Sequence, residues 1–245
     1  MSTLIDCLLR RGFLMETTEE GMCRLSDNAH PDDREDLCAL LDDCGLAELH
    51  ALSVPEGVSV ANLPELTAPA RQKILAAWDA SGGEEQYPRR LEKWSYFRKR
   101  QYGVKVPVRR LEPTIAFLVK ALNAVEVITW CSCGGQDSSP GRIDFVGPYA
   151  SAWAKFLVLD WLGADPELFV FDDAVMEICP KPGASVMDVA VAAAQKIYTS
   201  RLKLRELCAG CKESWGPHRA PEPEEFYAGC NTRLAQLKAV GSKTS

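Results

Sequence analysis

Cysteine is the residue type best able to do chemistry in this chain, and two of its ten cysteines stand one residue apart. Cys131 and Cys133 lie in the stretch TWCSCGGQD, at the end of a segment that predicts a β-strand. Residues two apart in a strand point to one face, so Cys131 and Cys133 share a face if the strand persists, and their sulfurs can converge if the chain turns at Cys133. The glycine pair that follows permits positive φ and leaves backbone N–H groups free for an anion. This CSC motif is either a catalytic or ligand loop, or a hairpin connection with two buried thiols.

A second group of cysteines follows the last long segment of helical periodicity. Cys208 and Cys211 have the CxxC spacing that presents two thiolates to one tetrahedral metal, and His218 and Cys230 follow at distances that allow a Cys3His zinc site. Three alternatives stay open: the CSC motif supplies the other two sulfurs, the CxxC pair is a redox or iron–sulfur motif, or no metal binds. We expect zinc as a structural cofactor.

Nearly all of the positive excess of the chain lies in one short segment. The net charge is −6, residues 1–86 hold 6 basic and 17 acidic residues, and residues 89–110 hold 9 basic residues and one acidic residue. In RRLEKWSYFRKRQYG, cations can contact phosphates while the interleaved aromatic rings stack on bases, as in RNA-binding proteins. The alternative is a solvated helix face that pairs with the acidic N-terminal third. The expected phosphate contacts are Arg89, Arg90, Lys93, Arg98, Lys99, Arg100 and Arg142.

These candidates need a scaffold, and the second half of the chain alternates between helical and strand patterns. Helices are expected at 113–123 and 149–162, and a long helix is expected from Ser185 to about Leu207. The stretches VKVPV, VEVITWC, RIDFV and LFVFDDAVMEIC predict strands, the first of them at a sheet edge because Pro107 lacks a donor. The fold class is therefore α/β (α+β), with helices packed on a small mixed sheet.

The N-terminal third predicts an acidic, mainly helical module. A short helix ending at Gly12, a hairpin around TTEEG and a helix over residues 31–44 follow one another. The negative charge argues against contact with DNA there, so this module is expected to bind a protein partner. The predicted organisation is a module at 1–80, a linker with a basic aromatic helix at 81–110, and an α/β domain at 111–237.

One local resemblance adds to this interpretation. The run from LNAVEVITWCSCGGQ to GRIDF resembles the helix, strand and SxSCSGR-like turn of the wybutosine-synthesising tRNA methyltransferases, whose active region includes that turn. The likeness spans at most residues 111–180, with Trp130 and Cys131 in place of small hydroxyl residues and Arg142 after the loop rather than directly after the glycine pair. It implies an α/β sheet, RNA nearby, and S-adenosylmethionine as a cofactor.

Three functions follow from these patterns. The favoured one is a zinc-stabilised protein that binds nucleic acid, RNA more than DNA, or takes part in RNA processing. The others are a cysteine-dependent enzyme, in which Cys131 or Cys133 is the nucleophile and His218 a base, and a non-catalytic protein-interaction module. No apolar run approaches the roughly 18 residues that a membrane span needs, and LIDCLL lacks the length of a signal peptide, so a cytoplasmic location without membrane contact is expected.

Overall fold

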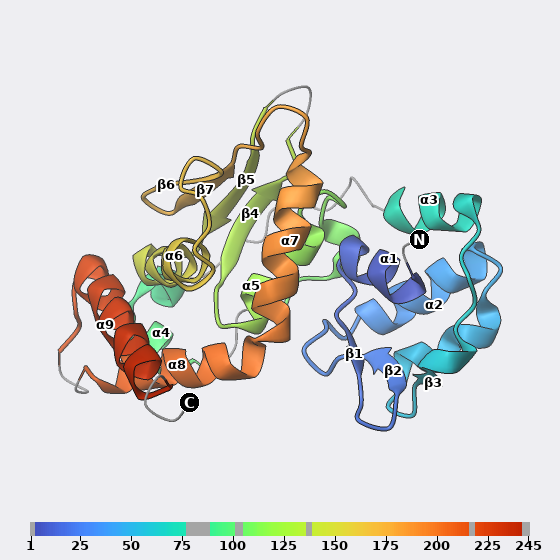
Figure 1. Cartoon of the computed structure of the whole chain (residues 1–245), viewed down its shortest axis with the longest axis horizontal. Helices are drawn as coiled ribbons and strands as arrows, with labels where there is room; N and C mark the ends of the chain where they lie inside the picture. The colour runs from blue at the N-terminus through green and yellow to red at the C-terminus, as the bar shows by residue number, and fades with distance from the viewer. Residues whose placement is uncertain (1–2, 77–88, 101–104, 136–138, 216–218, 242–245) are drawn as a thin grey trace. The chain divides into compact units, whose positions relative to one another are not determined.

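The computed structural model describes residues 3–76, 89–100, 105–135, 139–215 and 219–241 (Figure 1). They divide into two compact units. Unit 1 comprises Met1–Gly83 and Lys105–Lys120, and unit 2 comprises Glu84–Val104 and Ala121–Ser245. The sequence analysis expects three consecutive segments, at 1–80, 81–110 and 111–237. In the structure, unit 1 consists of two separate segments, the second of which is Lys105–Lys120.

Unit 1 combines short helices with a three-stranded antiparallel sheet of order β1-β2-β3. The sheet joins the predicted hairpin, in which Glu16 pairs with Arg24, to a third strand. Thr3 and Asp6 form a capping box that begins the first helix, and Gly12, with φ 107°, ends it. The elements of unit 1 are α1 (Leu4–Arg11), β1 (Met15–Thr17), β2 (Met22–Leu25), α2 (Asp33–Asp43), η1 (Ala47–Ser53), β3 (Val58–Ser59), η2 (Val60–Asn62), α3 (Ala68–Ala76) and η4 (Val108–Arg110).

A buried ion pair holds the later segment of unit 1 against α2. The carboxylate of Asp33 binds the ammonium group of Lys120, and both side chains are almost fully buried. The same carboxylate accepts hydrogen bonds from the backbone N–H groups of His30 at 2.9 Å and Val108 at 2.8 Å. Lys120 also donates to the carbonyl of Val106 at 2.6 Å. The hydrogen bonds of this one ion pair therefore join three segments of unit 1.

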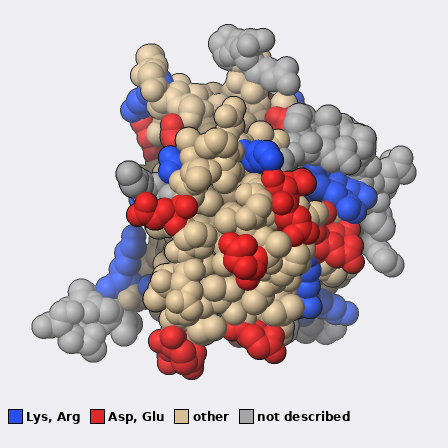
Figure 2. All heavy atoms as spheres, turned by 90° about the vertical axis from the view of Figure 1, so that its right-hand side faces the viewer, with Lys and Arg blue, Asp and Glu red and all other residues tan. Residues whose placement is uncertain are grey.

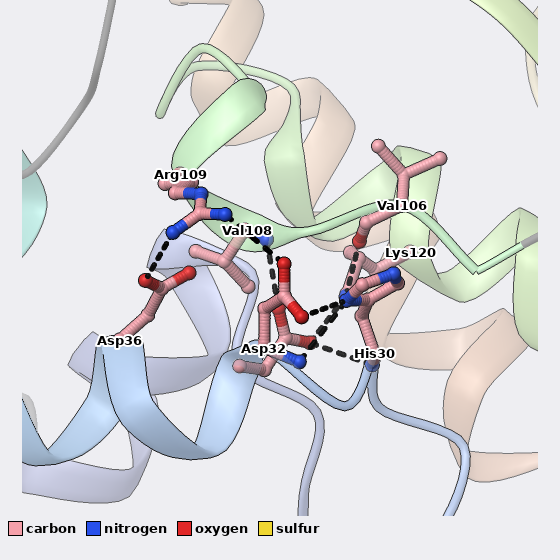
Figure 3. A network of polar contacts seen from close by, with 8 residues as sticks. His30, Asp32, Asp36, Val106, Val108, Arg109 and Lys120 are labelled. Carbon is pink, nitrogen blue, oxygen red and sulfur yellow. Dashed lines mark hydrogen bonds and ion pairs between the residues drawn. The ribbon is translucent and has the colours of Figure 1, made fainter. Parts of the chain in front are cut away.

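This network explains why the edge strand expected at VKVPV does not form over residues 105–108, the part of it that the structure describes. Lys105–Pro107 has no regular structure and Val108 begins η4. The N–H of Val108 and the carbonyl of Val106 bind Asp33 and Lys120, where a strand would offer them to a neighbouring strand. At the surface, Arg109 adds ion pairs to Asp32 and Asp36, visible in Figure 3. Side chains, and not a sheet, anchor this segment.

Unit 2 is an antiparallel sheet of order β4-β5-β7-β6 with helices packed on it. The α/β class is confirmed, although every strand pair of the described sheet is antiparallel and not mixed. The long helix expected from Ser185 to about Leu207 is two helices that meet at Ser200, and the second continues to Glu213. The elements are η3 (Arg89–Glu92), α4 (Trp94–Lys99), α5 (Ala116–Ala124, which begins in unit 1), β4 (Thr129–Cys133), β5 (Gly141–Phe145), α6 (Pro148–Lys155), the π-helix η5 (Phe156–Trp161), β6 (Phe169–Asp172), β7 (Val175–Ile178), α7 (Val186–Thr199), α8 (Arg201–Glu213) and α9 (Pro223–Gly241).

The two faces of this sheet differ sharply in character. Ile143 and Met176, which pair across β5 and β7, are fully buried and form part of the core. The next residues along, Arg142 and Glu177, pair on the opposite face, where Arg142 is exposed. Helices α6 and α7 contact β5 and β7. None of the helices in the described part of the chain is both long and apolar enough to cross a membrane.

The buried ion pair gives the first testable prediction. Replacing Asp33 by Ala leaves the ammonium group of Lys120 buried without its carboxylate, which is expected to lower the free energy of unfolding by about 3–5 kcal/mol. Urea unfolding followed by circular dichroism measures the change.

The neighbouring Asp32 is the matched control. Its carboxylate pairs with Arg109 at 3.0 Å at the surface, so Asp32→Ala is expected to cost about 1 kcal/mol or less. Equal losses of stability in the two variants would contradict the role assigned to Asp33.

Candidate nucleic-acid interface

The aromatic residues of α4 face the interior of unit 2. Trp94 and Phe97, three residues apart, are buried, with 6% and 1% of their surface exposed. They pack against Tyr149 of α6 and Phe226 of α9, with ring centroids 5.1–6.0 Å apart. Aromatic pairs at such distances add about 0.5–1.5 kcal/mol each beyond their buried area. These rings therefore hold α4 in place and are not available to stack on bases, while Tyr96 remains exposed on the helix.

Three cations at α4 lie close together in the sequence and are not neutralised by carboxylates of the residues described. Lys93 and Lys99 are exposed, Arg98 is half-buried, and none of the three forms an ion pair with any residue that the structure describes. By contrast, Arg142 binds Asp144, with a 2.7 Å contact from its Nε atom. Lys181 and Arg219 likewise pair with Asp165 and Glu225. Lys93, Arg98 and Lys99 thus form a group of uncompensated cations within seven consecutive residues.

A buried polar cluster lies at the end of α4. The guanidinium group of Arg100 donates to the backbone carbonyl of Glu126 and lies 4.9 Å from the ring centroid of Phe97. The ammonium group of Lys212 binds the carboxylate of Glu126, the carbonyl of Arg100 at 2.8 Å, and the face of the Phe97 ring. Burial lowers the pKa of Arg100 to about 10, so it stays charged at neutral pH. Arg100 is therefore fixed inside the cluster, unlike the exposed Lys93 and Lys99.

This cluster opens into a pocket of about 300 Å³. Four cationic side chains and two carboxylates line it, together with Ala209. The lining residues are Arg98, Lys99, Arg100, Glu126, Ala209, Lys212 and Glu213. The pocket brings three of the expected phosphate contacts together with two charged residues, Glu126 and Lys212, that the sequence analysis did not select.

The sequence pattern gives only weak indications that Glu126 and Lys212 belong to the candidate site. Glu126 interrupts the apolar run AVEVIT, where a strand pattern tolerates an outward-facing charge, and Lys212 directly follows the CxxC motif in a helix. The structure places Glu126 in the left-handed region, with φ 76°, and buries both side chains. Neither the turn at Glu126 nor its partner 86 residues away follows from a local pattern.

The CSC motif lies in a hairpin strand and not in a phosphate-binding loop. Cys131 and Cys133 pair with Asp144 and Arg142 in β5, which places both on the outer face of the sheet; Cys131 is half-buried and Cys133 exposed. A β-bulge at Trp130 leaves this ring 44% exposed. The glycine pair serves the turn, because a Cβ atom on Gly135 would lie 2.4 Å from the carbonyl oxygen of Ser139. The two thiols thus share a face with Arg142, as their spacing predicts.

Three further thiols gather between α8 and α9. Cys208, Cys211 and Cys230 are buried, and a hydrogen bond between Cys211 and Cys230 raises the pKa of the Cys230 thiol and lowers that of Cys211. Burial raises the pKa of Cys208, whose sulfur lies 3.6 Å from a carboxylate oxygen of Glu126. Two of these thiols therefore bind each other, and the third contacts the polar cluster behind α4.

The expected zinc ligands are only partly brought together. Cys208, Cys211 and Cys230 lie close to one another, but His218 falls outside the described residues. Within those residues, no group of three or more histidine, cysteine or acidic side chains has the arrangement to hold a metal ion. The side chains of Arg89 and Arg90 at the start of η3 also fall outside the description.

Acidic residues outnumber basic ones in unit 1. Figure 2 shows Asp and Glu side chains at several places on one face, with Lys and Arg side chains among them. The two segments of unit 1 together contain 16 acidic and 10 basic residues. The binding of a protein partner by this acidic module remains a hypothesis.

Comparison with known proteins adds no assignment: no protein-family model, curated protein or solved structure matches the chain. The resemblance of residues 111–180 to wybutosine-synthesising methyltransferases therefore stays a hypothesis.

The environments of the cysteines predict their order of reactivity. Cys133 is exposed and is expected to react first with iodoacetamide under native conditions, whereas Cys208 is fully buried beside a carboxylate and has a raised pKa, so it should react last. Mass spectrometry of peptides after timed alkylation measures both rates. Modification of Cys208 as fast as that of Cys133 would contradict the buried cluster, and reaction in denaturant supplies the common reference.

Proposed function

We propose that the chain binds nucleic acid, RNA more than DNA, through the basic helix α4 and its flanking residues. The observation that carries this proposal is the set of cations at α4 that no described carboxylate neutralises. Exposed, unpaired cations are the groups that gain most from a phosphate backbone, because binding releases the counterions of the nucleic acid and breaks no internal ion pair. The proposed phosphate contacts are Arg89, Arg90, Lys93, Arg98, Lys99 and Arg100.

The individual contributions differ within this set. Lys93 and Lys99 are exposed, whereas Arg98 and Arg100 are partly buried. Arg98, Lys99 and Arg100 line the pocket at the end of the helix. The exposed ring of Tyr96 offers one surface for base stacking, which favours single-stranded RNA. Arg142 contributes less, because Asp144 already binds its guanidinium group.

Two cofactors belong to the proposal as separate hypotheses. Zinc would stabilise the contact between α8 and α9 through Cys208, Cys211, Cys230 and His218, of which Cys211 and Cys230 are hydrogen-bonded to each other. S-adenosylmethionine, together with a role in RNA processing, rests on the resemblance alone. A cytoplasmic location is proposed with them.

A second candidate function is thiol chemistry on the outer face of the sheet. The observation that favours it is the guanidinium group of Arg142 beside Cys131, since a neighbouring cation stabilises a thiolate. Here Cys131 or Cys133 would be the nucleophile. Alkylation of one of them much faster than an unfolded cysteine would favour this hypothesis, and uniformly slow alkylation would dismiss it.

A protein-interaction role for unit 1 would show as partner binding that survives loss of the cations of α4.

Salt dependence tests the nucleic-acid proposal. Fluorescence anisotropy with labelled oligouridine is expected to show affinity that falls as salt rises. Each phosphate contact contributes about 0.7 to the slope of log K against log salt for a single strand, so replacing both Lys93 and Lys99 by Ala should reduce the slope by about 1.4.

Lys181→Ala is the matched control, because it also removes an exposed lysine but one already paired with Asp165. Its slope is expected to stay at that of the unchanged protein. Absence of binding at low ionic strength, or equal effects of the two replacements per lysine, would overturn the proposal.

Elemental analysis combined with native mass spectrometry tests zinc. The Cys3His hypothesis predicts one zinc ion per chain, lost when Cys208 and Cys211 are both replaced by Ser. Protein purified without chelators that carries no zinc would remove this part of the proposal and leave the RNA-binding part standing.

A further inference from the structure

The pocket at the end of α4 contains buried donors that lack acceptors. The Nε atom of Arg98 and the Nε and Nη1 atoms of Arg100 are shielded from solvent and make no hydrogen bond with the residues described. Both residues line the same pocket. A buried donor without a partner costs about 1–3 kcal/mol, and native proteins satisfy such groups with water, an ion or a ligand. Oxygen atoms of a bound ligand would remove this cost.

The charges that face the pocket favour a ligand with two negative charges. Arg98, Lys99, Arg100 and Lys212 provide four positive charges, and Glu126 and Glu213 provide two negative ones. The Glu126 carboxylate is bound to Lys212, so the excess lies on the side of α4. A phosphomonoester carries a charge of about −1.5 to −2 at neutral pH, whereas an internal phosphodiester carries one negative charge.

The size of the pocket sets a second limit. Its volume of about 300 Å³ corresponds to roughly ten water molecules at about 30 Å³ each. That is the lower end of the range of about 300–1,000 Å³ for small-molecule sites. The space accepts a phosphate with its sugar, and the two negative charges that the lining favours are those of a phosphate at a chain end.

We propose that this pocket binds a terminal phosphomonoester, supplied by the end of an RNA strand or by a free nucleotide. The inference deepens the proposed function and rests on it for the strand, because Arg98 and Lys99 belong to both sites. The guanidinium fork of arginine matches two phosphate oxygens at once, which lysine cannot do.

Glu126 is the positioning residue of this pocket. Its carbonyl accepts a hydrogen bond from Arg100 and its carboxylate binds Lys212, so one residue orients both cations. Phe97 supports the same two cations from its ring face. The positive φ of Glu126 is a conformation that a residue with a side chain adopts at a cost, and such backbone strain concentrates at functional sites. The pocket is therefore organised before a ligand arrives.

The test compares oligouridines of one sequence with a 5′-phosphate, a 3′-phosphate or only hydroxyl ends, alongside uridine monophosphate and inorganic phosphate. Isothermal titration calorimetry is expected to show that a terminal phosphate increases affinity about tenfold or more, which is the effect of one charge-assisted hydrogen-bonded contact.

Two variants locate the effect. Arg98→Lys keeps the charge but removes the Nε donor and the fork, so it is expected to abolish the preference for the phosphorylated end. Lys93→Ala removes a cation of the same helix that does not line the pocket, so it should weaken both forms by the same factor and keep the preference. Arg98 is half-buried at the surface, and circular dichroism verifies that the variant is folded.

Each outcome either supports or overturns the terminal-phosphate proposal. A tenfold preference that Arg98→Lys abolishes supports the proposal with the strand end as ligand. Binding of uridine monophosphate that depends on Arg98, with no preference among the oligonucleotides, supports it with a free nucleotide as ligand. If neither the terminal phosphate, the mononucleotide nor inorganic phosphate binds in a manner that depends on Arg98, the proposal fails. Failure of the broader RNA proposal is recognised separately, by hydroxyl-ended RNA that does not bind at low salt.

Discussion

The contact of the Glu126 carboxylate with the ammonium group of Lys212 is the interaction on which the candidate site depends. Both groups are buried, and an unpaired charge in that environment would cost several kcal/mol, so neither can leave without disturbing the other. The pair joins the turn after α5 to α8, and the carbonyls of Glu126 and Arg100 attach the end of α4 to it. The positions of the side chains around the pocket therefore depend on the contact between the buried Glu126 carboxylate and Lys212.

The same physical rule shapes unit 1, where Asp33 and Lys120 form the corresponding pair. Here the carboxylate collects backbone N–H groups from His30 and Val108 and thereby fixes a segment that has no sheet partner. Helix α5 carries Lys120 and leads directly into Glu126, so one short stretch of chain supplies a member of each buried pair. The two units are each organised around a charge that water no longer reaches.

Local patterns in the sequence predicted those features that depend on neighbouring residues. The α/β class, the N-terminal hairpin and the shared face of Cys131 and Cys133 all follow from periodicity and spacing, because alternation in a strand is a local property. The failure of VKVPV to form a strand, the break at Ser200 and the polar cluster do not. The missing strand reflects the contact between Asp33 and Val108, 75 residues apart, and the polar cluster reflects the contact between Glu126 and Lys212, 86 residues apart. No local pattern encodes which distant charge will be a partner.

The negative net charge of the chain does not argue against an anionic ligand at α4. At physiological ionic strength the Debye length is about 8 Å, so exposed charges farther away than this are largely screened. Helix α4 has 6 residues and, at about 1.5 Å per residue, is about 9 Å long, which keeps Lys93, Arg98 and Lys99 within roughly one Debye length of each other. A phosphate at this helix therefore experiences these cations together and any carboxylate beyond the Debye length only weakly. The local compensation of charge, more than the total of −6, determines what the surface attracts.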